Sequence, residues 1–215
     1  MARRSLRASL NVFVRSVNES RRLAVDAHAW ALPKAGTKRP MISKARRDSM
    51  VELAFLRSFL AWETFLEESF VLYLSGQKPP RGRAPTRYAF PPSLNDATDW
   101  VVPERQDYAT WTEPSRIARR AERFFRGGSP FAPVLRSHQS VLDDSRFLRN
   151  AIAHASAPAQ QKFENVVRQK IGVLPPTLTV GGFLGMTVPQ SSPPVTFLEH
   201  YLAKIELAAR LIVPT

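Results

Sequence analysis

Apolar residues recur at steps of three and four along much of the chain, which is the spacing of one face of an α-helix. The first stripe consists of Leu6, Leu10, Phe13, Val14 and Val17, roughly extended by Ala24 and Leu32. We therefore predict an N-terminal amphipathic helix. The basic loop KAGTKRP follows it, because Gly36 and Pro40 break the pattern.

A second and longer helix is predicted from about Ser43 to the residue before Gly76, a stretch without proline or glycine. It is apolar around much of its circumference, which is typical of a helix in the middle of a bundle. Glu63, Glu67 and Glu68 interrupt the apolar residues. They form either a solvated strip paired with arginines or a group with a catalytic role.

Residues 77–111 are predicted to form a long, basic excursion, because residues 77–103 contain six prolines and proline disfavours both helices and central strands. Excursions of this length are usually functional or mobile. The first half reads RGRAPTR, in which Arg81 and Arg83 could follow a nucleic-acid backbone.

Another helix is predicted after Thr112, with Pro114 in its first turn and Gly127 and Gly128 at its end. Its apolar face consists of Ile117, Ala118, Ala121, Phe124 and Phe125. Its other side carries Arg116, Arg119, Arg120, Arg123 and Arg126. These arginines form either a phosphate-binding ridge or a solvated helix face.

Three further helices are predicted, at Ser137–His154, Ala159–Ile171 and Phe197–Ile212. The helix that carries His154 should end shortly after it, near Ala157 and ahead of Pro158. Before the last helix, LTVGGFLGMTV alternates weakly and predicts either a short β-hairpin or a turn-rich loop. The expected fold is a single all-α domain over residues 1–215, in which residues 1–42 are a basic helix and loop.

The chain carries 31 basic and 18 acidic residues, a net charge of +13, and residues 1–50 alone hold 12 basic and 3 acidic groups. Such a field favours RNA or DNA, although an acidic membrane surface or a merely arginine-rich surface also accounts for it. The apolar run among the first residues is too short for the core of a signal peptide or for a membrane span. We therefore expect a cytoplasmic protein with no membrane partner.

Several common kinds of site lack their usual residues. Cysteine is absent, and none of the four histidines has a second histidine at metal-ligand spacing, so neither a metal site nor a cofactor is expected. The chain contains no GxSxG and no phosphate-binding P-loop, and GGFLG does not match GxGxxG.

The segment DDSRFLRNAIAHAS places Arg149, Asn150 and His154 near the end of a predicted helix. At about 100° per residue, Asn150 lies about 40° from His154 and Arg149 about 140°, with Asn150 between them. The trio therefore shares one polar sector among small and apolar neighbours. A structural alternative is that Arg149 pairs with Asp143 or Asp144 while the other two cap the helix.

The segment RNAIAH resembles the RNxxxH form of the signature of the HEPN superfamily of helical ribonucleases. The stretch AWETF in the long helix is similar to W-E-x-F sequences of HEPN proteins from prokaryotic toxin and phage-defence systems. The resemblance extends from about Ser43 to Ile212. It implies an HEPN-like bundle of four or more helices that forms a homodimer with a composite active site.

The resemblance also implies metal-independent RNA cleavage, in which the ribose 2′-hydroxyl attacks the neighbouring phosphate. His154 would transfer protons, because histidine changes charge near neutral pH. Arg149 would stabilise charge on the phosphoryl oxygens, and Asn150 would hold the imidazole or the phosphate. Glu63, from the W-E-x-F stretch, and Asp144 are candidates for groups that orient this trio.

Some HEPN toxins carry a tyrosine two residues after the histidine as a target for modification, but this chain has Ser156 there. A protein antitoxin or a sensor is therefore the expected regulator. The leading interpretation is a toxin or antiviral-defence endoribonuclease. A noncatalytic HEPN module that binds RNA or a protein, and a helical bundle unrelated to nucleic acid, are the alternatives.

Overall fold

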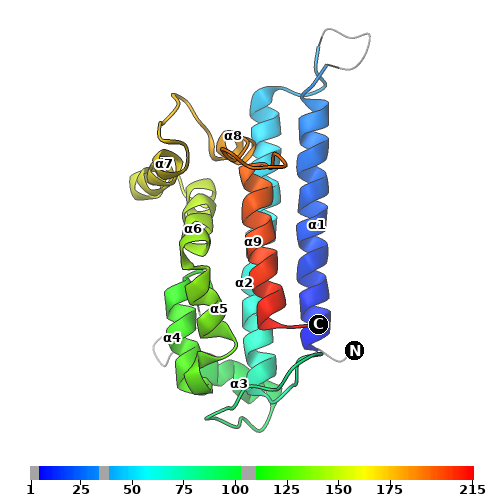
Figure 1. Ribbon diagram of the computed structural model, residues 1–215, viewed down its shortest axis with the longest axis vertical. Coiled ribbons are helices and arrows are strands. Elements are labelled where there is room, and N and C mark those ends of the chain that lie inside the picture. The colour runs from blue at the N-terminus through cyan, green and yellow to red at the C-terminus, as the bar shows by residue number, and fades with distance from the viewer. Residues whose placement is uncertain (1–4, 34–38, 103–109) are drawn as a thin grey trace. The chain divides into compact units, whose positions relative to one another are not determined.

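The computed structural model (Figure 1) describes residues 5–33, 39–102 and 110–215, and the regular secondary structure of these residues is almost entirely helical. The nine α-helices among them are α1 (Leu6–Trp30), α2 (Lys44–Leu74), α3 (Leu94–Val101), α4 (Pro114–Phe124), α5 (Phe131–Ser137), α6 (Gln139–Ala153), α7 (Ala157–Ile171), α8 (Val180–Leu184) and α9 (Phe197–Ile212). Strand pairing in the described residues is limited to isolated bridges. The predicted all-α class is confirmed.

The helices with the strongest periodicity lie where the sequence predicts them. α1, α2, α4, α7 and α9 begin within two residues of the predicted positions, and α9 agrees at both ends. Leu6, Leu10, Phe13 and Val17 are all buried. Leu32, however, lies beyond the end of α1 and is 64% exposed, so the stripe does not extend that far. The loop predicted around Gly36 falls mostly outside the described residues.

Three short helices were not predicted, and two of them overturn predictions of local structure. The proline-rich excursion contains α3, which begins after a Ser93 side chain that accepts a hydrogen bond from the Asp96 backbone N–H. α5 precedes the helix predicted from Ser137 and is separate from α6. In LTVGGFLGMTV the alternation is misleading, since Thr179 caps the short helix α8 and only Thr187 pairs, with Thr196, as an isolated bridge.

The chain divides into two compact units. Unit 1 takes its described residues from Met1–Val14, Ala61–Asp143 and Lys204–Thr215, and unit 2 takes its from Arg15–Leu60 and Asp144–Ala203. The divisions fall inside α1, α2, α6 and α9. The expectation of a single domain over residues 1–215 stays a prediction.

The core of unit 1 is aromatic. Phe70 packs against Phe131 and Phe125 with ring centroids 4.9 and 5.1 Å apart. Tyr73 is buried and donates a hydrogen bond of 2.7 Å from its hydroxyl to the Ile212 carbonyl. Burial raises the pKa of this phenol, so the hydroxyl remains a donor. α4, which carries several of the predicted site residues, packs against α5 in this unit.

Unit 2 has its own aromatic core and a set of polar anchors. Phe183 of α8 stacks on Phe197 of α9 with centroids 4.4 Å apart. α8 is tied to α2, because the Gly181 N–H donates to Glu52 Oε1 at 2.8 Å and the Thr179 hydroxyl donates to Asp48 Oδ2 at 3.1 Å. Acidic side chains near a helix N-terminus are electrostatically favourable.

No helix in the described part of the chain has both the length and the apolar character needed to cross a membrane.

Candidate functional site

The RNAIAH segment lies at the C-terminal end of α6, in unit 2. α6 ends at Ala153, and the His154 N–H still donates a helix-type hydrogen bond of 2.9 Å to the Asn150 carbonyl. Pro158 lies in the first turn of α7, so residues 154–156 form a short non-helical link. The predicted histidine therefore occupies the position where the helix stops.

His154 is exposed, as are the residues on both sides of it, Ala153 and Ala155. The small methyl groups of these alanines leave room around the imidazole. A group that exchanges protons with a large substrate must be within its reach, and this position meets that requirement.

Arg149 and Asn150 are half-buried one turn earlier on α6. Arg149 Nη1 donates to Asn150 Oδ1 over 3.3 Å, a long hydrogen bond. The contact uses the amide oxygen, and a carboxamide also has two N–H donors on its nitrogen. Arg149 and Asn150 thus present N–H donors of the kind that bind phosphoryl oxygens.

Further cations lie on α6 and α7 beside this segment. Arg146 and Lys162 both contact the ring of Phe147, with the guanidinium carbon 4.7 Å and the ammonium nitrogen 5.3 Å from its centroid. Sequence reasoning missed both. The signal for Arg146 was its place three residues before Arg149, which puts both arginines on neighbouring positions of one helix.

Asp144 has a structural partner in unit 2. Its carboxylate, on a side chain that is 7% exposed, forms an ion pair of 2.7 Å with the Lys170 ammonium of α7. Burial raises the pKa of the Tyr201 phenol, and the nearby Asp144 charge raises it further. Asp144 therefore anchors α6 to α7, and its predicted role in orienting the motif stays a prediction.

Glu63 is half-buried on α2 and belongs to unit 1. Its predicted contact with Arg149 or His154, which belong to unit 2, stays a prediction. The neighbouring Glu67 and Glu68 line a pocket of about 230 Å³ between α2 and α3. Burial and the charge of Glu68 raise the pKa of Glu67.

The arginines of α4 fall into two groups. Arg120 is half-buried, with its guanidinium 4.7 Å from the centroid of the Trp111 ring and a hydrogen bond of 3.1 Å from Nη1 to the Thr110 carbonyl. Burial and then the charge of Arg123 lower its pKa, against a smaller opposing effect of Glu67. Arg120 is thus held by contacts within unit 1.

The other arginines of this helix, Arg116, Arg119 and Arg123, are exposed. Arg116 forms an ion pair of 2.7 Å with Glu113, so part of its charge is neutralised. Arg81 and Arg83 are also exposed, and the Arg81 N–H donates to the Pro214 carbonyl at 3.1 Å. Exposed cations of this kind are available to phosphates.

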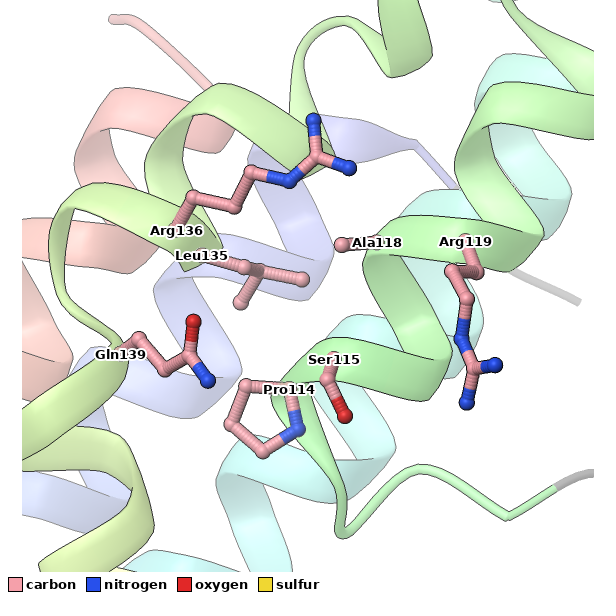
Figure 2. A pocket seen from close by; sticks show the side chains of 7 residues that line it. All are labelled: Pro114, Ser115, Ala118, Arg119, Leu135, Arg136 and Gln139. Carbon is pink, nitrogen blue, oxygen red and sulfur yellow. The ribbon is translucent and has the colours of Figure 1, made fainter.

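Arg119 lines a small cavity of about 130 Å³ in unit 1, shown in Figure 2. Pro114, Ala118 and Leu135 form its apolar part, and the polar groups around it belong to Ser115, Arg119, Arg136 and Gln139. Arg136 forms an ion pair of 2.6 Å with Glu122, and the Ser115 hydroxyl donates to Glu113 at 3.0 Å. The polar side chains of Ser115, Arg136 and Gln139 thus line the same cavity as Arg119 of α4.

Among the described residues, no group of three or more histidine, aspartate or glutamate side chains is placed to hold a metal ion.

Comparison with models of known protein families, with curated proteins and with solved structures finds no match to this chain.

Proposed function

We propose that this protein is a metal-independent endoribonuclease with Arg149, Asn150 and His154 as its catalytic residues. The observation that carries the proposal is the exposed end of α6, where a histidine follows directly on a turn that holds a guanidinium and a carboxamide in contact. The net charge of +13 favours a polyanionic substrate. The resemblance of RNAIAH and AWETF to HEPN ribonucleases supports the same chemistry.

In the proposed reaction the ribose 2′-oxygen attacks the adjacent phosphorus, and the bond from phosphorus to the 5′-oxygen breaks. The proton of the 2′-hydroxyl passes to a base, and the departing 5′-oxygen receives a proton. The products are a 2′,3′-cyclic phosphate and a 5′-hydroxyl. His154 performs one or both proton transfers, and Arg149 with Asn150 stabilises the charge that develops on the phosphoryl oxygens.

The resemblance extends the proposal to a cytoplasmic homodimer in which two copies of the motif share one cleft. In such a cleft, one copy of His154 takes the proton from the nucleophile and the other supplies the leaving group. We propose that the physiological role is that of a toxin or antiviral-defence effector, restrained by a protein antitoxin or a sensor. The measured mass in solution tests the dimer, and relief of growth arrest by His154→Ala tests the toxin role.

The test is cleavage of total RNA in EDTA by the wild type, by His154→Ala and by a matched control, His138→Ala. His138 is a suitable control because it also stands directly after a helix, at the end of α5. We expect the wild type and His138→Ala to cut and His154→Ala to be inactive. A synthetic RNA with one 2′-deoxynucleotide at the cut site should resist all three proteins.

The end groups of the products test the mechanism separately. A cyclic phosphate resists periodate, which requires a free 2′,3′-diol, and a 5′-hydroxyl resists direct ligation. Equal cleavage by the wild type and His154→Ala would show that the histidine is structural.

Noncatalytic RNA binding is the second candidate, and the exposed arginines Arg119 and Arg123 favour it because they can contact phosphates without any chemistry. It predicts that RNA binding by the wild type and by His154→Ala is equal and that neither protein cuts.

A further inference from the structure

Two aromatic side chains of unit 1 lie on the surface within a strongly basic stretch. Tyr88 is 58% exposed and Phe90 is 68% exposed. Residues 77–92 around them contain four basic residues and no acidic one. Exposed apolar groups that gather beside charge mark binding surfaces more often than isolated ones do. A partner suited to these two rings and to the basic residues around them has flat, apolar faces and negative charge.

Backbone hydrogen bonds fix this stretch against the end of α4. The Tyr88 N–H donates to the Phe124 carbonyl at 2.8 Å, and the Arg126 N–H donates to the Thr86 carbonyl at 2.9 Å. Between these bonds, Arg87 and Phe125 form an isolated antiparallel bridge. Tyr88 is thus held next to the helix that carries the exposed arginines.

The two bridged residues are turned away from solvent, since Phe125 is buried and Arg87 half-buried. Phe125 is fully buried, and Arg87 turns inward with it, donating from Nη1 to the Leu74 carbonyl at 2.7 Å. Tyr88 and Arg126, which follow the two bridged residues along the chain, are both exposed. The backbone bonds of Tyr88 to Phe124 and of Arg126 to Thr86 thus hold an exposed tyrosine and an exposed arginine on either side of one bridge.

Arg87 also supports Phe90, since its guanidinium carbon lies 4.9 Å from the centroid of that ring. The ring remains 68% exposed despite this contact. Arg119, Arg123 and Arg126 are all exposed and follow one another at steps of four and three, so the first two lie on one side of α4. Three exposed cations thus lie on α4 and directly after it, in the segment whose end is bonded to Tyr88.

We propose that this aromatic and arginine surface, formed by Tyr88, Phe90, Arg119, Arg123 and Arg126, binds single-stranded RNA. Bases stack on the two rings, and phosphates contact the guanidinium groups. Duplex RNA fits poorly, because its bases already stack on one another and are not free to pair with a protein ring. The proposal takes RNA as the nucleic acid from the proposed function and adds the strandedness and the stacking residues.

The test measures binding in the His154→Ala background, so that cleavage does not affect it. The probes are a fluorescent single-stranded RNA of about 12 nucleotides, the same sequence as a duplex, and a strand with abasic positions. The variants are Tyr88→Leu and Phe90→Leu, which keep apolar surface but lose the flat ring. Trp100→Leu is the control, since this residue is 46% exposed on α3 beside Asp99.

We expect the single strand to bind more tightly than the duplex and the abasic strand. Tyr88→Leu and Phe90→Leu should each weaken that binding about tenfold, as expected for the loss of one stacked base, whereas Trp100→Leu should change it less than twofold. Equal binding of all three probes, or no effect of the two leucine variants, would overturn the proposal in favour of charge alone. Tight binding of an acidic protein, retained in both variants and competing with RNA, would also overturn it.

Failure of this proposal is distinguishable from failure of the proposed function. If the wild type cleaves RNA in EDTA while Tyr88→Leu and Phe90→Leu leave RNA binding unchanged in the His154→Ala background, only the stacking surface is wrong. If neither cleavage nor saturable RNA binding is observed, both proposals are wrong.

Discussion

Two regions of unit 2 differ in how tightly their polar side chains are held. Where α8 meets α2, Asp48 is 5% exposed, its Oδ1 accepts a hydrogen bond of 2.9 Å from Arg47 Nε, and its Oδ2 accepts one from Thr179. At the end of α6, His154 and its neighbours are exposed. The first region has its polar groups bound by the protein, and the second presents them to solvent.

The difference separates residues that stabilise the fold from residues available for chemistry. When a buried polar group loses its partner, the free energy of unfolding falls, because the group has no access to water. An exposed side chain contributes little to stability and is free to contact a substrate. Substitutions in the two regions should therefore affect different measurements.

The largest expected effect on stability is that of Gly181→Ala. A Cβ atom at this position would lie 2.0 Å from the Asp48 carbonyl oxygen, so the backbones of α8 and α2 would have to separate. We expect a loss of about 3 kcal/mol in the free energy of unfolding, measured by urea denaturation.

The control for this prediction is Gly182→Ala, whose Cβ would meet the Thr179 hydroxyl at 3.0 Å, a side-chain atom that can move. Its cost should be at most about 1 kcal/mol. Equal losses for the two variants would show that the close approach of α8 to α2 does not determine stability.

The next largest effect is expected for Lys170→Met, which removes the partner of Asp144. The carboxylate is almost fully buried, so an unpaired charge should cost about 2 kcal/mol in thermal or urea unfolding. The double variant with Asp144→Asn should recover part of this loss, because no buried charge remains.

The control for the buried pair is Arg168→Ala, which breaks the exposed contact of 3.4 Å with Glu164. It should change stability by less than about 0.5 kcal/mol. A loss similar to that of Lys170→Met would mean that Asp144 does not depend on its ion pair.

A smaller, pH-dependent effect is expected for Glu67→Gln. The folded state binds the proton of Glu67 more tightly than the unfolded state, since its pKa is raised from 4.5 by burial and by Glu68. The wild type should thus lose a little stability as the pH rises through and above 4.5. The variant should lack this loss and be slightly more stable at neutral pH, and Glu67→Gln with an unchanged pH profile would contradict the assignment.

The smallest effect on stability is expected for His154→Ala. The exposed imidazole makes few contacts, so the free energy of unfolding should remain within about 0.5 kcal/mol of that of the wild type. RNA cleavage should nevertheless disappear. A large fall in the melting temperature would indicate that the histidine supports the fold and would leave a loss of cleavage uninformative about catalysis.

The helices that could be predicted are those whose apolar face continues for several turns. α2 and α9 are examples, because burial of a long stripe requires the 3.6-residue period. α3, α5 and α8 could not be separated from loops or from α6, since each is eight residues or shorter. In such short segments a single cap, such as Ser93 or Thr179, decides the conformation.

The candidate site was predicted in part. The sequence placed Arg149, Asn150 and His154 on one helix end, where the structure has them. It could not distinguish Arg120 from Arg119, because the stacking of Arg120 on Trp111 joins α4 to residues that no periodicity connects with it. Nor could it identify Tyr88, because the backbone hydrogen bond from Tyr88 to Phe124 joins segments that no periodicity connects.

By itself, the sequence determined the all-α class, the approximate starts of the long helices and the position of the RNAIAH segment, because helical periodicity and proline act over a few neighbouring residues. Only the tertiary structure decided which charges are bound and which are exposed. Asp144 pairs with Lys170, Gly181 fits against Asp48, and the Tyr88 N–H donates to the Phe124 carbonyl. Each of these contacts joins residues far apart in the chain, where local spacing carries no information.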